Sequence, residues 1–231
     1  MKYFKVVDKI NSEVSIDTNS TNYSLTLVNK DRYLNLLDFI TQSSNEFDLP
    51  LDFYLSLNNN IALCGDIYLQ NLPKSINDVF EVFALTNDSK HKGIYINEGD
   101  LIDIVETLGE IGFEVFQEGF YLWEHIYEKV RLNSYQDKPS RENSFFLFDN
   151  LKDCEYYIDK HKGGGQLCEV EILDTRYLFK ADMNLLDIIP NNFTFKQAEK
   201  LVADYWLGKT TDNTIFEYLF QGACRLKPII L

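Results

Sequence analysis

The sequence predicts an α+β fold, and the order of its elements is the main reason. Strand-like stretches that alternate apolar and polar residues lie near the start, helical spacings fill much of the middle, and strand patterns return near the end. A doubly wound fold would instead alternate strands and helices throughout. The 231 residues suffice for one large domain or two small ones.

The N-terminal half mixes both kinds of element. Asp31 is expected to cap a helix, and the polar residues 42–60 read as a loop. Gly99 and Asp100 open a second helix that Gly112 closes, and a third is expected over about 114–132 with an apolar stripe facing the core. The predicted β segments of this half are residues 3–7, 23–28, 61–69 and 79–85.

The C-terminal third has a more regular pattern. A helix is expected to start after Asp149 or Asn150 and to end at Gly163. Thr194 and Gln197 form a capping box at the head of another helix. The predicted strands are 144–148, 167–173 with 177–180 as a pairing segment, and a closing hairpin of 216–220 and 225–231.

The charge balance restricts the classes of partner. The chain has 22 Lys and Arg against 36 Asp and Glu, a net charge of −14. A field of this sign repels a nucleic-acid backbone, although a local basic groove could still exist. Aromatic residues make up 14%, which indicates a ring-rich core or a stacking surface.

Other sequence features suggest a soluble cytoplasmic protein without a metal centre. No apolar run is long enough to span a membrane, and the first nine residues read as a strand rather than a signal peptide. The four scattered cysteines are expected to be free and mostly buried. His91, His125 and His161 lie far apart, and no common catalytic motif is present.

Three segments have residues suited to chemistry, each with a structural alternative. The glycines at 163–165 could cradle an anion, but their position favours a helix C-cap. Arg141 offers a planar fork for phosphate or carboxylate, while spacing favours a simple pairing with an acidic neighbour. Glu217 lies in an apolar strand, either on a solvated face or held in a cleft.

The chain from about Trp123 onwards contains a characteristic order of segments. They are Glu128–Arg131, Lys138–Arg141 with Ser144–Phe146, Phe179–Leu186, Tyr205–Gly208 and Phe216–Leu219. In these segments the chain resembles an uncharacterised bacterial family similar to ADP-ribosyltransferases of the PARP and toxin superfamily. The resemblance implies a split mixed or antiparallel β core spanning residues 1–231 as a single domain, with 30–125 as a mainly helical insertion or subdomain. It also implies NAD as co-substrate.

The resemblance assigns roles to individual residues. Glu217 matches the late-strand catalytic glutamate, which hydrogen-bonds the 2′-hydroxyl of the nicotinamide ribose and stabilises the positive charge that develops there. Ser144 matches the strand serine, and Arg141 is expected to clamp the pyrophosphate. Tyr156 or Tyr157 is expected to stack on nicotinamide. By contrast, we expect Tyr205, Trp206 and Asp182 to be structural.

The first strand departs from the family pattern, because Lys5 stands where an Arg or His is expected. Lysine meets a phosphate as a point charge without a bidentate fork. The alternative is therefore a catalytically degenerate member that binds a partner protein or nucleotide. A third possibility is an interaction protein that works through its N-terminal half. For the enzyme, the acidic composition favours a protein acceptor over nucleic acid, and the resemblance suggests a toxin or phage-conflict setting with an antitoxin or other regulatory protein.

Overall fold

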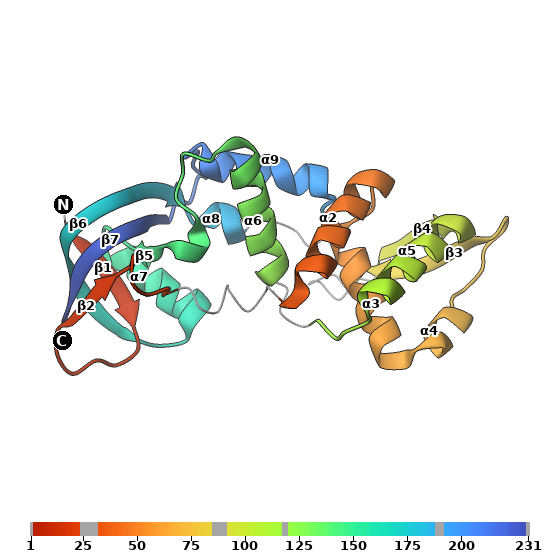
Figure 1. Ribbon diagram of the computed structural model, residues 1–231, viewed down its shortest axis with the longest axis horizontal. Helices are drawn as coiled ribbons and strands as arrows, with labels where there is room; N and C mark the ends of the chain where they lie inside the picture. Colours follow the sequence, from red (N-terminus) through yellow and green to blue (C-terminus); the bar gives the residue numbers. More distant parts are fainter. Residues whose placement is uncertain (1, 24–31, 85–91, 117–119, 188–191, 230–231) are drawn as a thin grey trace. The chain divides into compact units, whose positions relative to one another are not determined.

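The computed structural model describes residues 2–23, 32–84, 92–116, 120–187 and 192–229, and they form a mixed α+β chain (Figure 1). The predicted α+β class is confirmed. The residues group into two compact units. The first unit comprises Met1–Asn29, Tyr127–Ile188 and Leu201–Leu231, and the second comprises Lys30–Ile126 and Ile189–Lys200.

The first unit is built on an antiparallel five-stranded sheet. Its strands are β1 (Tyr3–Val7), β2 (Val14–Asp17), β5 (Phe145–Leu147), β6 (Gln166–Asp182) and β7 (Phe216–Pro228). Their order is β1-β6-β7-β2, and β5 also pairs with β7. Figure 1 shows β6 and β7 as long curved neighbours. One edge of β7 pairs with β6 along nearly its whole length. The other edge of β7 is shared by two strands, β5 at Tyr218–Phe220 and β2 at Ala223–Leu226.

The length of β6 and β7 corrects two predictions. Residues 167–173 and 177–180 belong to one strand, and the expected C-terminal hairpin is also a single strand. β6 continues as one strand across two bulges, which lie between Ile172 and Asp174 and between Thr175 and Tyr177. Gly222 lies beside them with φ +149°, where a Cβ would lie 2.2 Å from the Asp174 carbonyl oxygen. This glycine allows close strand approach instead of making a turn.

The core of the first unit is rich in aromatic residues. Tyr3, Phe145, Tyr218 and Phe220 are buried in one cluster with aliphatic and cysteine side chains. The rings of Tyr3 and Tyr218 meet edge to face, with centroids 5.1 Å apart. The expectation that many aromatic residues would lie in the core is confirmed here.

The remaining elements of the first unit lie between and after these strands. The short helix η2 precedes β5, and α7 runs into a π-helical turn, η3, whose last residue is followed by the left-handed Gly163. The Gly163 N–H donates to the Ile158 carbonyl, so the helix C-cap predicted there is confirmed. The bounds are η2 Arg141–Asn143, α7 Leu151–Tyr157, η3 Ile158–Lys162 and α8 Asn184–Asp187.

The second unit contains helices and a two-stranded antiparallel sheet. Its elements are α2 (Leu34–Phe47), α3 (Leu51–Cys64), α4 (Asp66–Gln70), β3 (Val79–Ala84), β4 (Lys92–Asn97) and α5 (Glu98–Ile111). The predicted loop at 42–60 and the predicted β segment at 61–69 are wrong, since both regions are largely helical. Asn58 and Asn59 were read as loop residues, but their amides donate to the carbonyls of Glu114 and Phe116. These tertiary contacts override the weak helix propensity of asparagine.

Two helices have residues in both units. They are α6 (Phe120–Ser134) and α9 (Phe195–Trp206). The capping box predicted for α9 is confirmed, because Gln197 Oε1 accepts from the Thr194 N–H at 3.0 Å. Gly112 ends α5 as predicted. The expected strand 23–28 and the Asp31 cap lie almost wholly outside the described residues. None of the helices in the described ranges is long and apolar enough to cross a membrane.

Candidate functional site

Glu217 is buried in the first unit. It is the second residue of β7, opposite Ala181 of β6, and its residue is 3% exposed. The sequence left open whether this carboxylate faces solvent or the interior, and the structure places it in the interior. An ionised carboxylate in such a place requires compensating partners.

Two side chains donate hydrogen bonds to the same carboxylate oxygen of Glu217 and so compensate its charge. Arg141 Nη1 donates to Glu217 Oε1 at 2.6 Å, and the Tyr205 hydroxyl donates to the same oxygen at 2.7 Å. Arg141 Nη1 also hydrogen-bonds the Tyr205 hydroxyl oxygen. The three side chains come from η2, α9 and β7, and all are buried. The expectation that Arg141 pairs with an acid is confirmed, and the acid is the candidate catalytic residue.

The other carboxylate oxygen of Glu217 has a different environment. Within the described part of the chain, both donors to Glu217 reach Oε1 and none reaches Oε2. A carboxylate oxygen accepts up to two hydrogen bonds. Glu217 therefore has unused acceptor capacity while Arg141 and Tyr205 fix its position.

Aromatic rings surround the guanidinium of Arg141. Its carbon lies 4.9 Å from the Phe146 ring centroid, 5.3 Å from that of Tyr205 and 5.4 Å from that of Tyr127. Ring faces attract a cation and also exclude water. Arg141 therefore holds Glu217 in surroundings of low polarity, where an electrostatic interaction is stronger than in water.

Lys5, on β1, is a second candidate cation of the site. Its ammonium lies 4.5 Å from the Phe145 ring centroid, and none of the carboxylates in the described ranges forms an ion pair with it. Burial, followed by the charge of Lys162, lowers the pKa of Lys5 to about 8. The Glu217 charge opposes that shift, so these two predicted site residues influence each other electrostatically.

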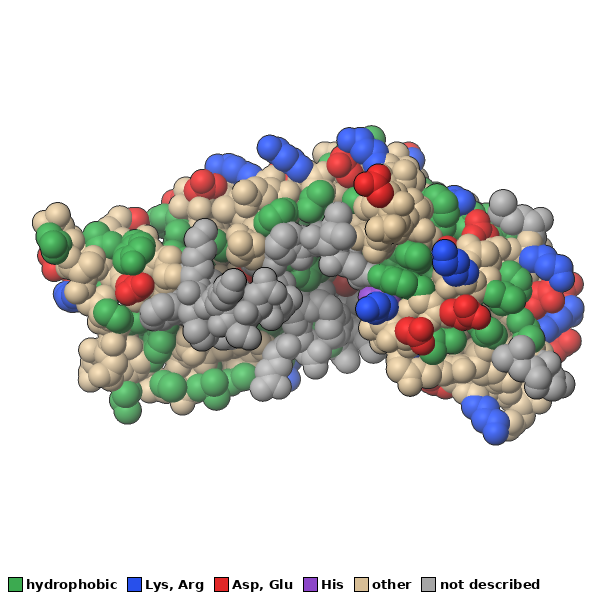
Figure 2. Space-filling view, turned by 180° about the vertical axis from the view of Figure 1, so that it is seen from behind, with side chains coloured by type: hydrophobic (Ala, Val, Ile, Leu, Met, Phe, Trp, Pro, Cys, Tyr) green, Lys and Arg blue, Asp and Glu red, His purple; other side chains and the backbone are tan. Residues whose placement is uncertain are grey.

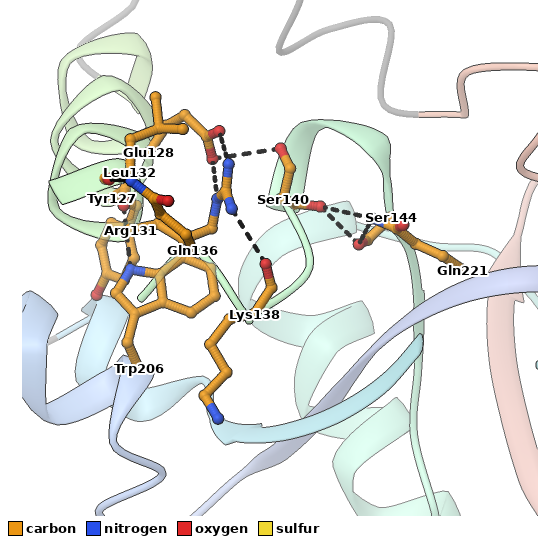
Figure 3. A network of polar contacts seen from close by, with 10 residues as sticks. All are labelled: Tyr127, Glu128, Arg131, Leu132, Gln136, Lys138, Ser140, Ser144, Trp206 and Gln221. Atoms are coloured by element: carbon orange, nitrogen blue, oxygen red, sulfur yellow. Dashed lines mark hydrogen bonds and ion pairs between the residues drawn. The ribbon is translucent and has the colours of Figure 1, made fainter. Parts of the chain in front are cut away.

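Ser144 lies beside Gln221 of β7. Its hydroxyl donates to the Ser140 carbonyl at 2.6 Å and accepts from Gln221 Nε2 at 3.2 Å, as Figure 3 shows. The residue is 1% exposed. Ser144 thus joins the segment that carries Arg141 to the same strand as Glu217, but it contacts a different residue of that strand.

The two candidate stacking tyrosines differ in their surroundings. Tyr157 stacks on His161 with centroids 5.6 Å apart, and it also packs against Phe148. Burial and, to a smaller extent, the Glu217 charge raise the pKa of Tyr157. The Tyr156 hydroxyl instead donates to Asn184 Oδ1 at 3.4 Å. The Glu217 charge therefore acts on Tyr157, one of the two candidate stacking residues.

The sequence did not reveal that Tyr205 takes part in the Glu217 cluster. It was predicted to be a core residue of its helix, and it is fully buried, as expected. Its hydroxyl is nevertheless part of the Glu217 cluster. A buried tyrosine hydroxyl needs a hydrogen-bond partner, so a tyrosine on a fully apolar helix face was the available signal.

The remaining sequence predictions concern structural residues. Asp182 accepts from the backbone N–H groups of Asn184, Thr211 and Ile215, which confirms its structural role. Cys154, Cys168 and Cys224 are buried and Cys64 is exposed, all of them free, as predicted. No group of three His, Cys, Asp or Glu suited to a metal ion occurs among the described residues.

The comparisons with known proteins give a family without an assigned activity. No curated protein matches the sequence. The family model described as "Protein of unknown function (DUF2441)" matches residues 9–230, nearly the whole chain. This chain therefore belongs to the DUF2441 family.

Proposed function

We propose that this chain is an NAD-dependent ADP-ribosyltransferase whose catalytic residue is Glu217. The observation that supports it is the arrangement at the Glu217 carboxylate: Oε1 is held by Arg141 and Tyr205, and Oε2 receives no donor from the described residues. A carboxylate fixed before the substrate arrives costs no reorganisation during the reaction.

The proposed chemistry uses that oxygen. Glu217 Oε2 accepts a hydrogen bond from the 2′-hydroxyl of the nicotinamide ribose. The bond between the ribose C1′ and the nicotinamide nitrogen breaks, and its electron pair leaves with nicotinamide. The negative charge of Glu217 stabilises the positive charge that develops on the ribose. An acceptor nucleophile, from a protein, then forms the new bond at C1′ and loses its proton.

The other members of the cluster have supporting roles in this proposal. Arg141 positions Glu217, since its guanidinium already faces that carboxylate. Lys5 supplies the cation for a phosphate of NAD, because no carboxylate of the described chain neutralises it. Tyr157 offers a ring for nicotinamide. Tyr156 donates to the Asn184 side chain and Ser144 to the Ser140 carbonyl, and both hold neighbouring segments in place.

The ADP-ribosyltransferase-like split β core is part of the same proposal. β5 and β2 occupy successive stretches of one edge of β7, while β6 runs along the other edge. This pairing supports a sheet divided into two parts. The candidate residues lie on β1, next to β5 and at the start of β7, three places that the sheet brings near one another.

A second candidate function is binding of NAD or another nucleotide without transfer. Its support is that Glu217 is 3% exposed and already paired with a buried arginine, as structural ion pairs often are. Lys5 in place of Arg or His also favours it. The same cluster would then serve recognition only.

One experiment distinguishes the two. The purified full chain is incubated with NAD, and released nicotinamide is measured by chromatography with and without an acceptor protein mixture. We expect release by the wild type and a loss of at least about a hundredfold in Glu217→Gln. Glu171→Gln, at an exposed glutamate of β6, is the matched control and should retain activity.

The outcomes separate the candidates. NAD binding by calorimetry without nicotinamide release would reject the transferase and support the binding module. Release that is equal in wild type and Glu217→Gln, with both proteins folded by circular dichroism, would exclude Glu217 as the catalytic residue. If the protein neither binds NAD nor releases nicotinamide under any acceptor condition, both functions are rejected.

A further inference from the structure

A polar cavity of about 520 Å³ lies in the first unit, apart from the Glu217 carboxylate. Its wall includes three basic residues, Arg131, Lys138 and Arg176, and several neutral hydrogen-bonding side chains. This grouping is notable in a chain of net charge −14. No acidic residue is among the side chains that line it.

Arg176 leaves its charge uncompensated at this cavity. Its Nη2 donates to the Gln221 side-chain carbonyl at 2.7 Å, and its guanidinium lies over the Tyr177 ring. Within the described ranges, no carboxylate forms an ion pair with it. Gln221 therefore orients an exposed arginine without neutralising it.

Arg131 forms a fixed part of the wall. Its Nε and Nη2 donate to the two carboxylate oxygens of Glu128, and its Nη1 donates to the Lys138 carbonyl at 3.1 Å (Figure 3). These contacts use three of its five N–H groups. The residue is 9% exposed, and Ser140 also donates to Glu128. The guanidinium is thus held rigid with two donors to spare.

Lys138 is the third cation. Its ammonium pairs with Asp137 at 3.1 Å, but Asp137 is largely exposed, and such a surface pair contributes little. The same ammonium lies 5.4 Å from the Phe179 ring centroid. Lys138 can therefore exchange this partner for an anion at small cost.

We propose that this cavity binds the phosphomonoester or pyrophosphate group of a small molecule. Several oxygens of such a group can accept from Arg176, Arg131 and neutral donors such as Asn143 at once, whereas a single carboxylate offers fewer acceptors. A volume of about 520 Å³ suits a small organic phosphate. The site is separate from the proposed transferase chemistry.

The lining of the cavity suits a small molecule rather than a nucleic-acid chain, because its three basic residues are gathered at one site. On the face that Figure 2 presents, Lys and Arg side chains lie among Asp and Glu without forming a continuous basic stripe. A nucleic acid needs a row of cations to match its successive phosphates. A single phosphate or pyrophosphate needs only the local cavity.

The test uses inorganic pyrophosphate as the probe. We expect saturable binding by the full chain in calorimetry, weaker as NaCl is raised. Arg176→Gln should weaken it about tenfold or more, because a charge-assisted contact is lost. Arg225→Gln removes the same charge from a half-buried arginine that does not line the cavity, and it should change the affinity by less than about twofold. Glu217→Gln should likewise bind pyrophosphate as the wild type does.

Each contrary result has a clear meaning. Absence of saturable pyrophosphate binding in the wild type would overturn the proposal, as would equal weakening by the two arginine variants. Tighter binding of a single-stranded oligonucleotide than of pyrophosphate, lost in Arg176→Gln, would overturn the choice of a small molecule. Loss of pyrophosphate binding in a folded Glu217→Gln variant would place the anion in the Glu217 cluster instead.

Discussion

Arg141 and Glu217 lie 76 residues apart in the sequence and form an ion pair of 2.6 Å in the interior of the first unit. The pair joins η2 to the start of β7, and Tyr205 adds a third element through the same oxygen. Such a pair is a weak source of net stability, because the cost of removing two charges from water offsets most of their attraction. Net stability therefore does not account for the pair, and under the proposed function its role is to fix the Glu217 carboxylate.

The first prediction concerns the free energy of unfolding of variants at this pair. Arg141→Met leaves the buried Glu217 carboxylate without its cation, and Glu217→Leu removes a carboxylate partner from the buried Arg141 guanidinium, each costing about 3–5 kcal/mol. The double variant should lose much less than the sum, since neither charge remains. Urea unfolding of the four proteins measures this coupling. In Glu217→Leu the Tyr205 hydroxyl still accepts from Arg141 Nη1, whereas in the double variant it loses both partners, so the measured coupling includes the Arg141–Tyr205 contact.

Additive losses would show that the two charges do not depend on each other. The double variant also separates stability from function. If it folds well but releases no nicotinamide, the pair is retained for chemistry rather than for stability. A double variant with full activity would remove Glu217 from the mechanism.

The second prediction concerns Tyr205→Phe. This change removes the donor to Glu217 Oε1 and the acceptor for Arg141 Nη1, and the loss of these two buried hydrogen bonds should cost about 1–3 kcal/mol of stability. If Tyr205 positions Glu217, kcat should fall about tenfold with little change in the KM for NAD. Tyr3→Phe, at a buried tyrosine of the same unit that forms no hydrogen bond through its hydroxyl within the described residues, is the matched control. Equal kcat values in the two variants would restrict Tyr205 to packing.

Much of the fold could be predicted from local patterns, and the failures have physical causes. The cap of α5 and the capping box of α9 depend on neighbouring residues, which the sequence shows directly. The close approach of Gly222 to Asp174 depends on a strand more than forty residues away, and without it residues 216–220 and 225–231 were predicted to form a hairpin. The asparagines of α3 depend on distant carbonyl groups and were read as a loop.

The site shows the same division. Glu217 and Arg141 were named as separate candidates because their residue types suit the chemistry. That they meet at one carboxylate oxygen depends on the pairing of β5 with β7, which no local pattern reveals. Tyr205 was assigned to the core from helical spacing, which describes where a side chain points but not what its hydroxyl contacts.

The third prediction concerns Asp52, in the first turn of α3 in the second unit. Burial raises the pKa of Asp52 to about 6, and its Oδ2 is buried without a hydrogen-bond partner among the described residues. The folded state thus holds the proton more tightly than the unfolded chain, so the contribution of Asp52 to stability falls as the pH rises from about 4 through 6. Asp52→Asn should therefore stabilise the protein by about 1 kcal/mol at pH 7.5.

That gain should shrink towards zero at pH 4, where Asp52 is protonated in the folded protein. Thermal melts of wild type and Asp52→Asn at pH 4, 6 and 7.5 measure the difference. Asp103→Asn changes an exposed aspartate of α5 and serves as the control, with no such trend expected. A stability difference that is constant with pH would show that Asp52 does not titrate in this range.

The fourth prediction concerns Lys5. Burial lowers the pKa of this residue to about 8. If its ammonium meets a phosphate of NAD, the affinity for NAD should fall as the pH rises through 8, reaching about tenfold weaker near pH 9 if the neutral amine contributes little. Lys5→Arg stays charged throughout and should keep its affinity between pH 7 and 9. Lys5→Met should bind weakly at every pH. Lys160→Met, at an exposed lysine, should behave as the wild type.

The same titration has an opposite effect on folding. The folded protein releases the Lys5 proton near pH 8 and the unfolded chain near 10.5, so between these values the unfolded chain binds more protons and the stability contribution of Lys5 rises with pH. Lys5→Met should abolish that rise. NAD affinity that decreases while stability increases, both lost in Lys5→Met, would identify one group as the cause. If the NAD affinity of the wild type does not change between pH 7 and 9, Lys5 does not bind a phosphate of NAD. If the pH dependence of stability is the same in Lys5→Met as in the wild type, the Lys5 amine is not desolvated in the folded protein.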